Sequence, residues 1–162
     1  MARWADVERE APELAERVKQ AFDANKHKTM ATLRRDGAPR ISGTELDFFD
    51  GNAYLGSMPG SVKARDLQRD PRIALHSATV DPELAGGDAK LAGRAIEVTD
   101  RAEFEAFLRR YADENEQAPE GDFPLFRVDV EEIVLTAIGD PPDHLVIEHW
   151  HEGRGTQRVE RK

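Results

Sequence analysis

Two Asp-Gly pairs, at residues 36–37 and 50–51, constrain the fold of this chain more than any other feature. Each pair separates two runs of strand-forming residues, and Asp-Gly between such runs is a strong short-range signal for a β-hairpin. A hairpin makes its two strands antiparallel. We therefore expect residues 29–34, 39–49 and 53–57 to form three consecutive antiparallel strands.

Helices and further strands follow from the rest of the pattern. Apolar residues spaced three and four apart predict a helix over 11–24. Asp100 followed by Glu103 predicts the capping box of a helix over 101–111. The remaining predicted strands cover residues 72–77, 89–98, 125–130 with 133–138 as a pair or one bent strand, and 145–150. A fold that is mainly β with helices on its outside is expected, namely a closed antiparallel barrel.

Length and composition bound the possible functions. The 162 residues fit one domain, with an N-terminal helix in 1–25, a barrel core in 26–138, and a C-terminal strand and polar tail in 139–162. The net charge of -9 argues against nucleic acid or an anionic membrane as the main partner. No Cys is present, so disulfides and thiolate chemistry are excluded. No apolar leader or membrane-spanning run is seen, which predicts a cytoplasmic protein.

The segment over residues 57–78 carries the clearest functional signal. A Pro-Gly turn follows Ser57, Ser61 can cap a short helix that starts at residue 62, and Lys63 and Arg65 lie at the start of that helix. The helix dipole disfavours cations in a first turn, so these two side chains need another reason to be there. A phosphate bound at the helix N-terminus is one such reason. Solvated surface charges and a purely structural cap are the plainer interpretations.

The order hairpin, hairpin, short helix S-V-K-A-R-D-L and then D-P-R-I-A-L resembles the pyridoxamine 5'-phosphate oxidase-like, FMN-binding split-barrel family. The resemblance extends over roughly residues 26–138, and A-T-L-R-R-D-G-A-P-R-I before the helix supports it. It implies an antiparallel split β-barrel that forms a homodimer, with flavin at the subunit interface. It also implies the cofactor-binding residues Arg40, Ser42, Gly43, Thr44, Ser57, Ser61, Lys63, Arg65 and Trp150.

The resemblance gives these residues separate roles. Lys63 would bind the cofactor phosphate with hydroxyls from the two serines, and Arg40 would reach the phosphate or the ribityl chain. Residues 42–44 would lie beside the ring system. Trp150, with Arg154 or Arg158, would contact flavin across the dimer, although a tryptophan at this position is also typical of a core or an interface.

Two departures change the expected activity. Val62 stands where the true pyridoxamine phosphate oxidases have Arg, and the tail lacks their R-x-H substrate motif, so the vitamin B6 reaction is not predicted. A small relative is expected, an FMN-dependent oxidoreductase acting on a small organic substrate. The alternatives are a reductase using 8-hydroxy-5-deazaflavin, a non-enzymatic flavin- or haem-binding module, and a structural dimer with a vestigial site. No catalytic residue is assigned, because the cofactor carries the chemistry.

Three histidines near the C-terminus raise the question of a metal. His149 and His151 are two residues apart on a predicted strand, so both can face one side, and His144 is nearby. A structural zinc site usually needs four convergent ligands, and we predict no metal.

Overall fold

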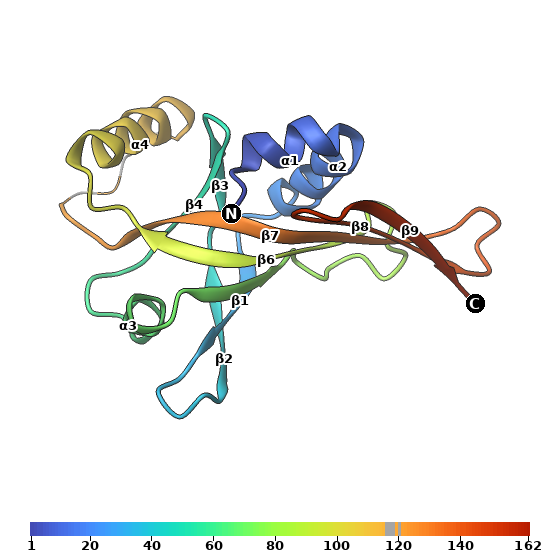
Figure 1. Cartoon of the computed structure of the whole chain (residues 1–162), viewed down its shortest axis with the longest axis horizontal. Helices are drawn as coiled ribbons and strands as arrows, with labels where there is room; N and C mark the ends of the chain where they lie inside the picture. The colour runs from blue at the N-terminus through green and yellow to red at the C-terminus, as the bar shows by residue number, and fades with distance from the viewer. Residues whose placement is uncertain (116–118, 120) are drawn as a thin grey trace.

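The structure is a computed structural model that describes residues 1–115, 119 and 121–162, and Figure 1 shows its arrangement. The helices are α1 Trp4–Glu10, α2 Pro12–Asp23, α3 Val62–Arg69 and α4 Arg101–Glu114. The strands are β1 Lys28–Leu33, β2 Pro39–Thr44, β3 Asp47–Phe49, β4 Asn52–Gly56, β5 Arg72–His76, β6 Asp88–Glu97, β7 Leu125–Ile138, β8 Leu145–His151 and β9 Gly155–Arg161.

All of these strands belong to one antiparallel sheet, as the hairpin signals predicted. Along the sheet the order is β2-β1-β5-β6-β7-β4-β3, and β8 with β9 extends from the second half of β7. The two ends of this path, β2 and β3, are joined by residues 45–46 alone. Such a short connection requires the sheet to curl until its ends meet, and this confirms the antiparallel split barrel.

The strand predicted over 39–49 is two strands. β2 pairs with β1 over Pro39–Thr44, whereas β3 pairs with β4 at the other end of the sheet. Leu46, between them, is 1% exposed and belongs to the core. The alternation of apolar and polar residues continues through this corner, so the sequence pattern contains no sign of the break.

The N-terminal region holds two helices rather than one. The apolar stripe of α2 is buried, as its spacing predicted, but α1 precedes it and is also buried through Trp4 and Val7. Helix α2 packs on β6, β7 and β8, whereas α1 packs on β4 and β7, and Trp4 contacts Phe48 with ring centroids 4.5 Å apart. Among the described residues, no helix is long and apolar enough to cross a membrane.

Helix α4 lies over a second, smaller apolar cluster. Asp100 caps it by accepting a hydrogen bond from the Ala102 N–H, and the helix continues past its predicted end to Glu114. Phe104 and Phe107 pack there against β3, β4 and the start of β7. Residues 116–118 and 120, which follow this helix, are outside the described residues.

The C-terminal tail, predicted only as a polar basic segment, forms β9. It pairs with β8 along its whole length, and Arg161 opposes Leu145. The tail has no apolar alternation because nearly all of β9 is exposed, so its pairing rests on backbone hydrogen bonds that periodicity does not reveal.

Candidate functional site

The start of helix α3 is built as the sequence predicted. Gly60, with a φ of +70°, turns the chain after β4, and Ser61 caps the helix by accepting a hydrogen bond from the Ala64 N–H at 3.3 Å. The hydroxyls of Ser57 and Ser61 are 2.7 Å apart. Among the described residues, the N–H groups of Val62 and Lys63 have no hydrogen-bond acceptor, so they remain available to an anion.

Lys63 joins this helix to strand β2. Its ammonium group donates a 2.6 Å hydrogen bond to the carbonyl oxygen of Gly43. Partial burial lowers the pKa of Lys63, and the charge of Glu45 acts in the opposite direction. Lys63 therefore lies at the seam between β2 and α3, shortly after Ser57 and Ser61 in the chain.

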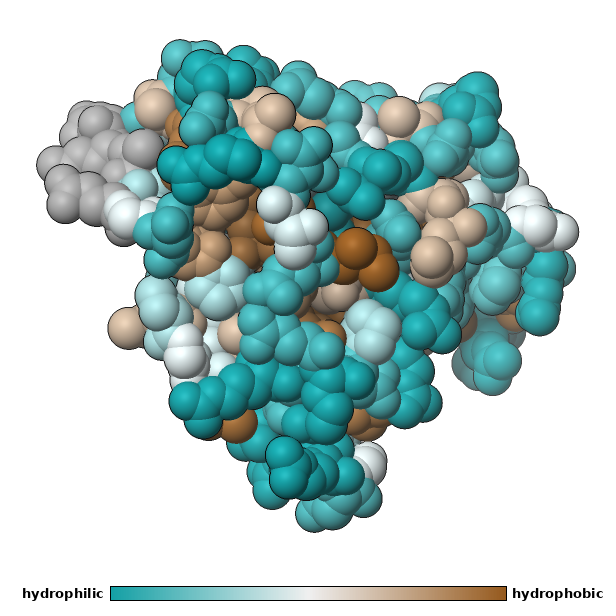
Figure 2. All heavy atoms as spheres, turned by 60° about the vertical axis from the view of Figure 1, so that its left-hand side comes forward, coloured by the Kyte–Doolittle hydropathy of each residue, from teal (hydrophilic) through white to brown (hydrophobic). Residues whose placement is uncertain are grey.

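A cavity of about 480 Å³ opens beside this seam. In Figure 2 hydrophobic side chains are visible in a hollow of an otherwise largely hydrophilic face. Four of the predicted cofactor residues line the cavity: Gly43, Thr44, Ser57 and Lys63. Aromatic rings also line it, from Phe107, Tyr111 and Phe123. Their apolar surface can accept a flat ring system, while the lysine and the serine can meet a charged group at the edge.

Two carboxylates that sequence reasoning did not single out line the same cavity, at Glu45 and Asp47. Burial raises the pKa of Asp47 to about 6, and the neighbouring charge of Glu45 adds to this shift. A carboxyl group with a perturbed pKa inside a cavity is typical of functional sites. In the sequence, the only sign of these two cavity carboxylates is that acidic residues flank Leu46, where the apolar alternation continues.

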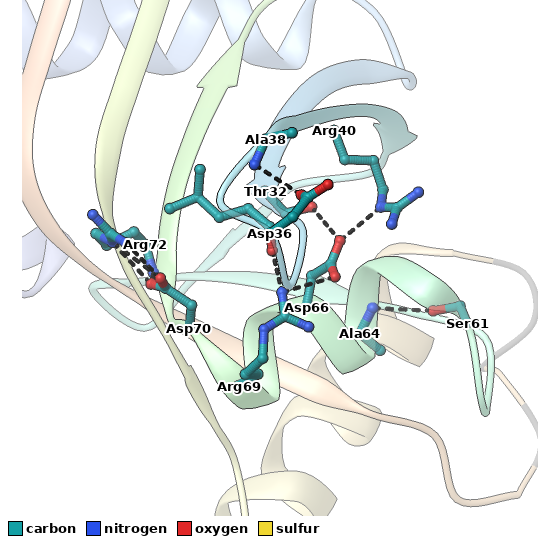
Figure 3. A network of polar contacts seen from close by, with 11 residues as sticks. Thr32, Asp36, Ala38, Arg40, Ser61, Ala64, Asp66, Arg69, Asp70 and Arg72 are labelled. Carbon is teal, nitrogen blue, oxygen red and sulfur yellow. Dashed lines mark hydrogen bonds and ion pairs between the residues drawn. The ribbon is translucent and has the colours of Figure 1, made fainter.

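Arg40 does not line the cavity. Its Nε donates a 2.6 Å hydrogen bond to the carboxylate of Asp66, which is 3% exposed, and this pairs β2 with α3 (Figure 3). Ser42 lies between Arg40 and the cavity on β2 and is half-buried. Arg65 on α3 is exposed, and its guanidinium lies near Gly60 at the start of the helix. The structure therefore gathers some of the predicted residues around the cavity and leaves these three beside it.

Trp150 is the clearest correction. It is fully buried in the main core, where its indole N–H donates to the Glu10 carboxylate at 3.0 Å. A side chain held there by helix α1 cannot reach the cofactor cavity, so the core interpretation of this residue applies.

Two of the C-terminal histidines bond to residues next to them in the chain: His144 bonds to Asp143, and His151 to the Glu152 carbonyl. Within the described ranges, no three His, Cys, Asp or Glu side chains are grouped to hold a metal ion.

The curled antiparallel sheet and the capped helix beside its edge strand define the class of split-barrel proteins. Residues 14–137 match the sequence profile of the family described as pyridoxamine 5'-phosphate oxidase. The match covers well over half of the chain, and the chain belongs to this family. No curated protein matches the chain in sequence.

Solved structures share the fold at low identity. An FMN-binding protein from Nostoc punctiforme, described as related to pyridoxamine 5'-phosphate oxidase, has a TM-score of 0.65 and 12% identity, covering 94% of this chain and 96% of that one. A haem-binding protein from Mycobacterium smegmatis has a TM-score of 0.58 and 17% identity, covering 90% and 86%. A protein of unknown function from Agrobacterium tumefaciens is 24% identical with a TM-score of 0.58, and the match covers 74% of this chain but 56% of that longer one.

Proposed function

We propose that this chain binds FMN as a homodimer in the cytoplasm and uses it as an oxidoreductase on a small organic substrate. The observation that carries the proposal is the anion-binding arrangement at the start of α3: Lys63 and Ser57 line the cavity, and the Ser61 hydroxyl lies 2.7 Å from that of Ser57. Membership of the family and the FMN-binding Nostoc protein of the same fold support it.

The residues present fit the cofactor. Lys63 and the two serines would hold the phosphate, and Ser42, Gly43 and Thr44 on β2 would lie along the ring system. When bound, FMN supplies hydride and one-electron chemistry, and the protein binds and orients it. Because the carboxylates of Glu45 and Asp47 also line the cavity, the phosphate is expected beside Lys63, whose positive charge offsets theirs.

A second copy of the chain is proposed to cover the outer side of β2. Ile41 on this strand is 71% exposed, and it borders an apolar groove of about 270 Å³. The groove crosses five neighbouring strands and includes the small residues Ala31, Ala74 and Ala92. An exposed apolar face of this kind is typical of a subunit interface, and here it continues onto the strand that would carry the flavin.

The proposal is tested by titrating the apoprotein with FMN and with riboflavin, which lacks the phosphate. A charge-assisted contact contributes about 1.5–3 kcal/mol. Lys63→Ala is therefore expected to weaken FMN binding by roughly 10- to 150-fold, at about 1.4 kcal/mol per tenfold, and to leave riboflavin binding nearly unchanged. Arg65→Ala, on the exposed side of the same helix, is the matched control and should cost much less.

Wild-type protein that binds neither flavin would overturn the proposal, and so would Lys63→Ala with undiminished FMN affinity. An equal loss for both flavins would show that the substitution damaged the fold rather than a phosphate contact. Retention of the fold is checked by the urea midpoint of each variant.

A haem-binding module is the second candidate, since His27 lines the same cavity and a haem-binding protein shares the fold. A deazaflavin would use the same phosphate anchor. The absorption spectrum of the ligand released on denaturing the purified protein distinguishes haem, FMN and deazaflavin. Haem has an intense Soret band, FMN absorbs at about 450 nm, and deazaflavin absorbs more weakly at that wavelength.

A further inference from the structure

Asp66 is a buried carboxylate that pairs with two arginines, although one would neutralise its charge. Its side chain accepts hydrogen bonds from Thr32 Oγ1 at 3.1 Å, from Arg40 Nε at 2.6 Å and from an Arg69 terminal nitrogen at 3.0 Å. Burial alone would raise the pKa of Asp66, but these donors outweigh it and hold the pKa below its ordinary value. The carboxylate is therefore ionised at neutral pH.

One guanidinium would be enough to neutralise this charge. Arg69 is three residues further along α3, so it pairs with Asp66 within the helix and also donates to the carbonyl of Leu33. Arg40 comes from another element, strand β2, and adds a second positive charge at the same carboxylate. The cluster keeps a net positive charge, although the protein as a whole carries -9.

The contact also sets the orientation of Arg40. The guanidinium is bound through Nε, and among the described residues no protein acceptor is bonded to its two terminal nitrogens. In the view of Figure 3, Arg40 and Arg69 approach Asp66 from opposite sides, with Arg40 on the side of the helix start at Ser61. A guanidinium restrained at Nε presents its terminal N–H groups as a fixed fork, the geometry that suits phosphate.

Arg40 and Lys63 border the same seam. Lys63 reaches the carbonyl of Gly43, three residues along β2 from Arg40, and Asp66 is three residues along α3 from Lys63. Two contacts thus fasten α3 to β2, and each of them involves one cation. In the second contact the partner of the cation is a buried acid, Asp66.

We infer that Asp66 is a positioning residue of the proposed site: it holds Arg40 in place so that Arg40 and Lys63 together receive the phosphate monoester end of the cofactor. The inference rests on the proposed function. Asp66 itself does not touch the ligand. Its part is to restrain the Arg40 side chain before binding, so that less conformational entropy is lost when the phosphate arrives.

The test compares phosphate-dependent affinity with stability in Asp66→Asn. This variant keeps the size of the side chain and an oxygen acceptor but loses the charge. Outer contacts that orient a ligand-binding group typically contribute about 10–100-fold, and we expect FMN affinity to fall by about tenfold, with riboflavin affinity within about twofold of wild type. Arg69→Gln is the matched control. It removes the other cation of Asp66 and leaves Arg40 bound, so the ratio of FMN to riboflavin affinity should stay as in wild type.

Arg40→Lys provides a second route if Asp66→Asn does not fold. It keeps a positive charge but lacks Nε, and it should lose FMN preference while the protein stays folded. Where Asp66→Asn does fold, adding it to Arg40→Lys should bring no further loss of that preference.

The possible failures are distinguishable. Wild-type protein that does not bind FMN would overturn the proposed function and this inference together. Wild-type protein that binds FMN, with Asp66→Asn or Arg40→Lys lowering FMN and riboflavin affinity equally or lowering stability alone, would overturn the inference and leave the proposed function intact.

Discussion

Asp47 offers a test of the cavity electrostatics that needs no ligand. Burial raises its pKa to about 6 from the ordinary value of 3.8, the carboxylates of Glu45, Asp23 and Glu114 act in the same direction, and Lys28 opposes them. The folded protein therefore binds this proton more tightly than the unfolded chain. The contribution to stability is fully present below about pH 4 and is lost as the pH rises through about 6.

The magnitude follows from the size of this shift. About two pKa units correspond to about 3 kcal/mol at 1.4 kcal/mol per unit, and partial exposure of the side chain reduces the effect to about 1–2 kcal/mol. Asp47→Asn removes the charge at nearly constant size. We expect it to raise the free energy of unfolding by about 1–2 kcal/mol at pH 7.5 and by clearly less at pH 5.

Urea unfolding followed by tryptophan fluorescence at the two pH values measures this difference. Asp113→Asn, on the exposed surface of α4, is the control and should change stability by less than about 0.5 kcal/mol at either pH. A variant less stable than wild type at pH 7.5, or a gain that does not depend on pH, would refute the argument.

Three further predictions concern packing and assembly. Gly93→Ala should cost at least about 3 kcal/mol in unfolding free energy, because a Cβ at this β-bulge would lie 2.0 Å from the carbonyl oxygen of Asp129. Trp150→Phe should lower the urea-derived stability by about 1–3 kcal/mol through the lost hydrogen bond to Glu10 and lost volume, while the preference for FMN over riboflavin persists. Ile41→Glu should shift sedimentation from dimer toward monomer, and a wild-type chain that sediments as a monomer at micromolar concentration would contradict the proposed assembly.

Local sequence signals were enough to predict the elements around the site. The Asp-Gly pairs predicted both hairpins, and Ser61 predicted a capped helix that starts at Val62, which the structure shows to run to Arg69. These features depend on turn and capping chemistry within a few residues, which is why a single sequence reveals them.

Features that depend on distant partners were missed. The break at Glu45–Leu46 and the strand Gly155–Arg161 have no local signal, because one is decided by closure of the barrel and the other by pairing with β8. The role expected for Trp150 was wrong for a similar reason: Glu10, 140 residues earlier in the chain, accepts its indole hydrogen bond in the core.

The sequence by itself determined that the chain forms antiparallel hairpins and places a serine-capped, lysine-bearing helix directly after the third predicted strand. Only the tertiary structure decided which residues the side chains of this helix and of the neighbouring strands contact. Curling of the sheet brings the Gly43 carbonyl to Lys63, Asp66 to Arg40, and the Asp47 carboxyl into a partly buried cavity beside α4. Charge and burial at these positions arise from contacts between segments far apart in the chain, and no local pattern records them.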